Sequence, residues 1–150
     1  RVISSTAIRR HIEKGRLRQA EAMLGRPVSV YGSVVRGHGR GRLIGFPTAN
    51  LDPHHETLPP EGVYAVWVDL SGRRVKGVLH IGARPTFGER DKSVEVHLLD
   101  WKGRLYGREL ELFFVKKVRS TRRFADTKSL SRAIARDILV VRRLPQGRNG

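Results

Sequence analysis

The residues best suited to chemistry lie in two short segments, and the first is "GFPTAN", which ends in Thr48 and Asn50. A threonine hydroxyl is a natural ligand for Mg²⁺, which takes few protein oxygens and leaves its other positions to nucleotide phosphates and water. In an extended segment Asn50 points to the same side as Thr48, and its amide then contacts phosphate or metal-bound water. The other interpretation is that both residues form a turn.

The second segment is "SVEVHLLD" (93–100), which carries Glu95. Its alternating pattern places Val94 and Val96 on one face of a strand, and Glu95 and His97 on the other. A carboxylate on a strand can act as a general base that orients an attacking hydroxyl and accepts its proton, as phosphoryl transfer requires. The alternative is that Glu95 is a solvated charge on a polar strand face.

A glycine-rich stretch, "GHGRGRLIG", precedes Thr48 and contains Gly37, Gly39, Gly41 and Gly45. Glycines let successive backbone N–H groups converge into a nest that suits a phosphate. No Lys-Ser/Thr pair follows, so the stretch is not a Walker A loop, and the G-x-G-x-x-G pattern fails because its third glycine is missing. A phosphate bound here must use a different scaffold.

The elements that must position these residues are mostly short strands. Runs rich in β-branched and aromatic residues occupy 28–35, 63–70, 74–81, 93–100 and 109–118. Compact turns at 70–74 and 100–104 predict antiparallel hairpins between the flanking runs. Helical patterns do not separate the strands, which favours a small barrel or sandwich over a parallel βαβ sheet. We therefore predict a mainly β domain of five or six strands.

Helical patterns flank this β region at both ends of the chain. Ser5 or Thr6 can cap a short first helix that stops at Gly15, and a second pattern runs on to Gly25. Near the C-terminus, Asp126 or Thr127 can cap an amphipathic helix. The apolar stripe of that helix consists of Leu130, Ile134, Ile138 and Val141. The last residues, 144–150, are predicted to be a disordered tail.

Composition limits the class of protein. The chain has 150 residues and no cysteine, which excludes a disulfide framework and a thiol nucleophile and favours a reducing, cytoplasmic setting. No apolar run is long enough to span a bilayer, so no membrane partner is expected. The histidines at 38, 54, 55, 80 and 97 include no pair with the helical spacing of a metal site.

The net charge of +16 points at first to a polyanionic partner. The excess is confined to the ends, however, because residues 1–26 carry +5 and residues 116–150 carry +9, which leaves +2 for residues 27–115. A nucleic-acid module is expected to place its basic stripe beside its stacking groups. Because the aromatic-rich middle is nearly neutral, a solvated basic surface is the better interpretation.

Five segments resemble, in order and in spacing, the riboflavin kinase module of bacterial bifunctional riboflavin kinase/FAD synthetase. These segments are "GRGRLIGFPTANL", "LPPEGVYAVWV", "GVLHIGARPTFG", "VEVHLLDWKGRLYGREL" and "FADTKSLSRAIARDI". The resemblance covers about residues 25–142. It implies a six-stranded antiparallel Greek-key β-barrel with short N-terminal helices and a C-terminal amphipathic helix. It also implies ATP-dependent, Mg²⁺-assisted phosphorylation of the riboflavin 5′-hydroxyl to give FMN and ADP.

The resemblance assigns roles to particular residues. Thr48 would bind Mg²⁺ and, with Asn50, the ATP phosphates, while Glu95 would be the catalytic base. The Gly37 to Gly45 stretch would be a flap over the nucleotide. In "RSTRRF" (119–124), Arg119 and Phe124 match family residues near the flavin, with a role in the core as the alternative for Phe124.

Two positions depart from the family pattern, and one N-terminal segment points to a second module. His80 stands where the family usually has Asn, and Ala133 where a helix Gln is common, which affects details of the flavin pocket. "ISSTAIRR" resembles the end of the adenylyltransferase module of the same enzymes. We therefore expect 1–25 to be a remnant of that module without FAD synthetase activity, 26–143 to be the kinase domain and 144–150 the tail.

A different class of function stays open from the sequence. The chain could be a β-barrel that binds nucleic acid through its basic surface, or a regulatory module that binds flavin without catalysis. Salt-sensitive affinity for nucleic acid would distinguish the first of these from a kinase.

Overall fold

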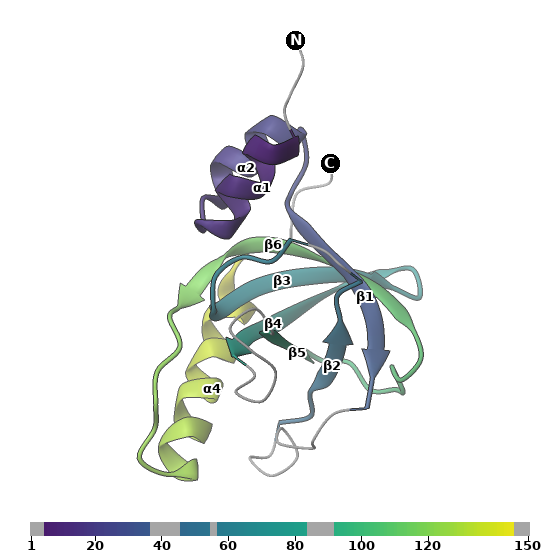
Figure 1. Ribbon diagram of the computed structural model, residues 1–150. Helices are drawn as coiled ribbons and strands as arrows, with labels where there is room; N and C mark the ends of the chain where they lie inside the picture. Colours follow the sequence, from purple (N-terminus) through teal and green to yellow (C-terminus); the bar gives the residue numbers. More distant parts are fainter. Residues whose placement is uncertain (1–4, 37–45, 55–56, 84–91, 146–150) are drawn as a thin grey trace.

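The computed structural model describes residues 5–36, 46–54, 57–83 and 92–145 (Figure 1). The predicted nucleotide-binding glycines, Gly37, Gly39, Gly41 and Gly45, lie outside these ranges. Most of the predicted tail, residues 146–150, lies outside them as well.

Six antiparallel strands close into a barrel (Figure 1). They are β1 (Ser29–Val35), β2 (Ala49–Asp52), β3 (Gly62–Leu70), β4 (Arg73–Ala83), β5 (Lys92–Leu98) and β6 (Glu109–Arg119). The order around the barrel is β1-β2-β5-β4-β3-β6, and β6 pairs with β1 to close it. Because β3, β4 and β5 follow one another and β6 returns to lie beside β3, the topology is a Greek key. The predicted fold is confirmed.

The connection between β3 and β4 is the predicted hairpin, and the connection after β5 is not. Ser71 and Gly72 join β3 to β4 with φ values of +49° and +79°, as a type I′ turn requires. The predicted hairpin around 100–104 is wrong, because β5 pairs with β2 and β4, while β6 pairs with β1 and β3. A turn signal shows that the chain bends, but it does not determine the strand that the next segment joins.

Strand β2 was not among the strand-like runs of the sequence, because it is only four residues long and follows Pro47. Its place in the barrel depends on a close approach to β1. A Cβ atom on Gly32 would lie 2.2 Å from the carbonyl oxygen of Asp52, so only glycine lets the two strands meet there.

The core fills the barrel, and each strand contributes alternate side chains to it. Tyr64, Leu79 and Val96 are paired across β3, β4 and β5 and are at most 1% exposed. Strand β3 is buried on both faces, because Val63 and Ala65 on its outer side pack into a second apolar cluster with Val141. One outer face of the barrel is therefore covered, and a helix covers it.

That covering helix is α4 (Thr127–Arg143), which packs mainly against β4. Asp126 caps its start by accepting a 2.7 Å hydrogen bond from the Ser129 backbone N–H. Lys76 on β4 donates from Nζ to the carbonyl oxygens of Arg142 and Leu144 at the other end. The predicted N-cap and the apolar character of the helix are confirmed, although the deepest stripe is rotated to Ala133, Asp137 and Val141.

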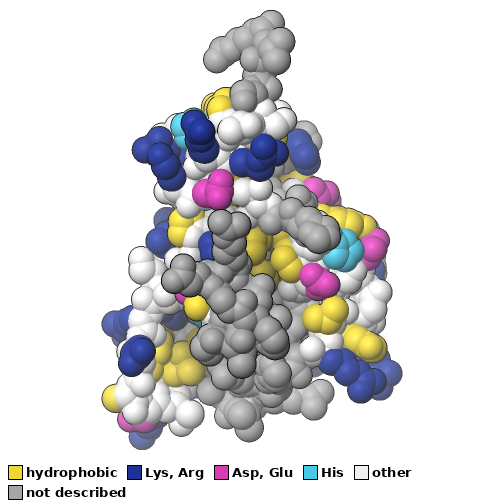
Figure 2. All heavy atoms as spheres, in the orientation of Figure 1, with side chains coloured by type: hydrophobic (Ala, Val, Ile, Leu, Met, Phe, Trp, Pro, Cys, Tyr) yellow, Lys and Arg dark blue, Asp and Glu magenta, His cyan; other side chains and the backbone are white. Residues whose placement is uncertain are grey.

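Helices α1 (Ser5–Glu13) and α2 (Leu17–Leu24) cover one end of the barrel (Figure 1). Their Ile12 and Ala20 belong to the same buried cluster as the strands. Figure 2 shows Lys and Arg side chains over this helical end and at the opposite end of the molecule. None of the helices in the described ranges is long and apolar enough to cross a membrane.

Candidate active site

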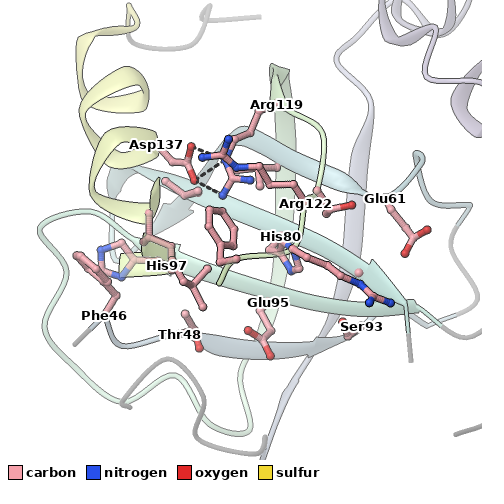
Figure 3. Close-up of a pocket in the computed structure, with 18 of the residues that line it drawn as sticks. Phe46, Thr48, Glu61, His80, Ser93, Glu95, His97, Arg119, Arg122 and Asp137 are labelled. Atoms are coloured by element: carbon pink, nitrogen blue, oxygen red, sulfur yellow. Dashed lines mark hydrogen bonds and ion pairs between the residues drawn. The ribbon is translucent and has the colours of Figure 1, made fainter. Parts of the chain in front are cut away.

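A cavity of about 730 Å³ opens between α4 and the outer face of the barrel (Figure 3). Its walls come from the segment before β2, from β3, β4, β5 and β6, from the chain after β6, and from α4. A cavity of this size suits a small organic ligand. Every predicted site residue in the described part of the chain, except Asn50, contributes to its walls.

Strand register explains why these residues meet. Arg119 pairs with Val63, Val63 with His80, His80 with Glu95, and Glu95 with Asn50. Directly opposed residues on neighbouring strands place their side chains on the same face of a sheet. One row therefore crosses five strands on the outer face of the barrel and ends in Arg119 on β6 and Asn50 on β2. We call these five residues the site row.

Thr48 lies just before β2 and is held there by contacts with β5. The Nδ1 atom of His97 is 2.7 Å from the carbonyl oxygen of Pro47, so this nitrogen carries the proton that makes the hydrogen bond. The rings of His97 and Phe46 also meet edge to face, 5.9 Å apart. The turn interpretation fails for Asn50, which is in a strand. His97 thus has a positioning role that the sequence did not indicate.

Glu95 is half-buried and points into the cavity (Figure 3). Val94 and Val96 on either side are about 1% exposed and face the core, so the predicted alternation is confirmed. Within the described ranges no group forms a hydrogen bond with the Glu95 carboxylate. A carboxylate in a partly closed cavity without an internal partner is available to a bound ligand.

Arg119 is anchored at the other end of the site row by Asp137 of α4. Its Nε lies 2.9 and 3.1 Å from the two Asp137 carboxylate oxygens, and its Nη2 lies 2.9 Å from one of them. The Asp137 side chain is only 5% exposed. This bidentate ion pair therefore ties the helix to β6 and fixes the guanidinium in the cavity wall.

An aromatic ring lies beside this ion pair. The guanidinium carbon of Arg119 is 5.6 Å from the centre of the Phe124 ring, and that of Arg122 is 4.8 Å from it. Phe124 is half-buried, lines the cavity and belongs to neither buried apolar cluster. The core interpretation of Phe124 is therefore wrong, and its ring is part of the cavity wall.

His80 projects into the cavity between the two ends of the site row (Figure 3). Its ring keeps contact with solvent through the opening, but the surrounding walls remove enough water to lower its pKa from the ordinary value. Arg119 lowers the pKa further, whereas Glu95, Asp137 and Glu61 raise it. The dominant cause is desolvation, so the imidazole is neutral at pH 7.

Most of the chain matches one known protein family. A family model described as "Flavokinase: Riboflavin kinase" matches residues 24–144. The chain belongs to the riboflavin kinase family. The matched range begins at the end of α2 and includes the whole barrel, the cavity and α4.

Curated relatives of this riboflavin kinase domain are larger proteins. A bifunctional riboflavin kinase/FMN adenylyltransferase of Escherichia coli K12 is 45% identical over 141 residues, covering 93% of the chain and 45% of the relative. The protein of the same name from Bacillus subtilis is 40% identical, covering 90% and 44%. The chain thus spans less than half the length of these relatives.

Solved structures share the fold of this riboflavin kinase domain. A Streptococcus pneumoniae structure titled a macrolide-efflux protein superposes with a TM-score of 0.84 at 32% identity, covering 95% of the chain and 47% of that protein. Riboflavin kinase from Trypanosoma brucei superposes with a TM-score of 0.56 at 22% identity, covering 76% of each chain. The second likeness shows the fold alone.

Asp137 and Arg122 are among the wall residues of this riboflavin kinase domain that the sequence pattern did not reveal. The signal for Asp137 was present, because a carboxylate four residues from Ala133 and from Val141 lies on the buried side of a helix. A buried carboxylate needs a cation nearby. Nothing in the local pattern identified that cation as Arg119, since the pairing depends on how α4 docks.

Proposed function

We propose that the chain transfers the γ-phosphoryl group of ATP to the 5′-hydroxyl of riboflavin, giving FMN and ADP. The observation that carries the proposal is the site row, which sets Glu95 and Arg119 into one cavity. Phosphoryl transfer needs mainly positioning and charge neutralisation. One carboxylate that orients the hydroxyl and one group of residues that binds the phosphates are therefore sufficient for the reaction. The family supplies the identity of the two substrates.

Glu95 is the proposed general base. Its carboxylate accepts the proton of the riboflavin 5′-hydroxyl as the hydroxyl oxygen bonds to the γ-phosphorus. The bond from that phosphorus to the β–γ bridging oxygen breaks, and ADP leaves. Half-burial in the cavity limits the access of water, which would otherwise compete as the attacking group.

Thr48 and Asn50 form the proposed phosphate end. Both lie on the Glu95 side of β2, since Asn50 pairs with Glu95 and Thr48 is two residues before it. We place Mg²⁺ on the Thr48 hydroxyl. Within the described residues no three or more acidic, histidine or cysteine side chains are arranged to hold a metal ion, so an ion on Thr48 would be bound mostly by phosphates and water. When bound, Mg²⁺ supplies charge neutralisation at the ATP phosphates.

Arg119 and Phe124 are the proposed contacts of the flavin ring. A large flat ring favours an aromatic or apolar wall with a few polar anchors, and Phe124 beside Arg119 provides both. The glycines of the nucleotide flap lie outside the described residues, so Gly37, Gly39, Gly41 and Gly45 are proposed from the resemblance alone.

We propose that the complete enzyme also contains the adenylyltransferase module named in its relatives, and that residues 1–25 mark its end. That module would convert FMN to FAD, and the present chain would not.

Because ATP is an intracellular substrate, we place the enzyme in the cytoplasm. The nucleic-acid alternative finds no support in the cavity, whose features suit a small substrate.

The decisive experiment incubates the folded chain with riboflavin, ATP and Mg²⁺ and separates FMN by chromatography. We expect FMN from the wild type, and a loss of about a hundredfold or more in Glu95→Gln. Thr48→Ala is expected to lose activity as well. Glu111→Gln is the matched control, because Glu111 is a strand carboxylate on β6 outside the cavity walls that accepts a hydrogen bond from Ser29. Full turnover in both site variants would overturn the proposal.

A further inference from the structure

His80 has no part in the mechanism proposed above, yet it occupies the centre of the site row. It pairs with Val63 on one side and Glu95 on the other. Figure 3 shows its ring between the Arg119–Asp137 pair and Glu95. It is therefore placed between the proposed flavin end and the proposed base.

The spacing between neighbouring strands gives approximate distances between the residues of the site row. Neighbouring strands lie about 4.8 Å apart, so three steps separate β6 from β5 by about 14 Å. His80 lies one step from Glu95 and two steps from Arg119 along this line. A substrate whose ring rests on the Arg119 and Phe124 side, and whose end reaches Glu95, must pass over His80.

The part of riboflavin that spans this distance is the ribityl chain, which carries secondary hydroxyls. A hydroxyl both donates and accepts hydrogen bonds, and a neutral imidazole does the same with its two nitrogens. Desolvation in the cavity lowers the pKa of His80 and so favours the neutral ring, and the charged groups that face it are Glu95, Arg119, Asp137 and Glu61. His80 is thus matched to a polyol rather than to a phosphate.

The neighbours of His80 also leave room for its ring. A Cβ atom on Gly82 would lie 3.0 Å from Cε1 of His80 and 3.2 Å from Oγ of Ser93. Glycine at position 82 therefore leaves the space into which the imidazole of His80, a cavity-wall residue, extends.

We propose that His80 is a specificity-determining residue, which hydrogen-bonds the secondary hydroxyls of the ribityl chain and so sets the reacting hydroxyl against Glu95. This inference rests on the proposed function, because it takes riboflavin as the acceptor. It adds that the enzyme distinguishes acceptors by their polyol chain and not by the flavin ring alone.

The test compares two acceptors: riboflavin, and a flavin whose ring carries a plain hydroxypentyl chain without secondary hydroxyls. Both are measured for binding, by quenching of flavin fluorescence, and for phosphoryl transfer. The variants are His80→Leu, which keeps the volume, and His80→Asn, which keeps a donor and an acceptor. His54→Asn is the matched control, since His54 lies outside the cavity walls against Ser33 and Tyr31.

We expect the wild type, His80→Asn and His54→Asn to prefer riboflavin, and His80→Leu to lose about tenfold of that preference, equivalent to about 1.4 kcal/mol. If His80 had a purely structural role, His80→Leu would weaken the binding of both acceptors equally and leave the ratio of their affinities unchanged. That result would overturn the inference. A wild type that binds both acceptors equally would overturn it too. If neither the wild type nor any variant transfers phosphate but the binding preference follows His80 as expected, the kinase proposal fails, and with it the placing of a reacting hydroxyl against Glu95, while the contact of His80 with the ribityl chain stands.

Discussion

Desolvation shifts the pKa values of Tyr64 and His80 in opposite directions, although Tyr64 is buried and the His80 ring still contacts solvent. Desolvation disfavours the charged form of each group, so it raises the pKa of Tyr64 to about 12 and lowers the pKa of His80. Tyr64 uses its retained proton to donate a 2.6 Å hydrogen bond to the carbonyl oxygen of Pro60, which fixes the chain entering β3. His80 uses its neutral state at the open side of the same sheet.

The lowered pKa of His80 predicts a dependence of stability on pH. Between its ordinary pKa of about 6.5 and its lower folded value, the unfolded chain binds a proton that the folded chain does not. Stability contributed by the neutral ring is therefore present at pH 7 and is lost as the pH falls through this window. Urea unfolding at several pH values should show that the free energy of unfolding falls less with decreasing pH in His80→Asn than in the wild type. Equal losses would contradict the assignment.

At the scale of elements, α4 is the part on which the cavity depends, because it supplies one wall and holds Arg119 through Asp137. Asp137→Asn leaves the guanidinium without its ion partner in a mostly buried setting. We expect the free energy of unfolding to fall by about 3 kcal/mol. This is the lower end of the range for breaking a buried ion pair, because the Arg119 side chain is 24% exposed. Weaker riboflavin binding should accompany it.

The control for that prediction is the exposed ion pair between Arg142 and Asp100, which also connects α4 to the barrel. Arg142 lowers the pKa of Asp100 mainly through their hydrogen bond. Asp100 has a φ of +57°, and asparagine accepts that conformation. Asp100→Asn should change stability much less than Asp137→Asn and leave flavin binding unaltered. Denaturant titrations and fluorescence quenching measure both effects, and similar losses in the two variants would refute the special role of Asp137.

Elements with a clear period were predictable from the sequence, and contacts between distant elements were not. The five longer strands were predictable from alternating apolar residues, and α4 from apolar residues at helical spacing. The N-cap role of Asp126 was predictable from capping chemistry. Strand β2 is too short to show a period, and the partners of β5 depend on barrel closure. Thr48 and Glu95 could be proposed from the sequence, since their chemistry is local, and both line the cavity. The ion pair of Asp137 with Arg119 could not be predicted, because it depends on how α4 docks.

For the whole molecule, the helical end and the barrel share one buried cluster, although the cavity lies elsewhere. Ile12 of α1 is 7% exposed and packs into the cluster formed by the strands. No residue of α1 or α2 lines the cavity. The described chain should therefore unfold as one unit, and damage at the helical end should lower stability without changing the chemistry.

Ile12→Ala tests this coupling. The variant removes buried methyl and methylene groups and is expected to lower the free energy of unfolding by about 2–4 kcal/mol, in a single transition. The kcat and the KM for riboflavin of the folded variant should match the wild type. Leu139→Ala is the control, because Leu139 on α4 is 50% exposed and its truncation leaves no buried cavity. Urea unfolding followed by fluorescence of Trp67 and Trp101 gives the measurement, since Trp67 of β3 stacks on Phe113 of β6 and Trp101 packs against the barrel core. If Ile12→Ala left the barrel transition unchanged, or split unfolding into two steps, α1 and α2 would be a separate unit resting on the kinase domain.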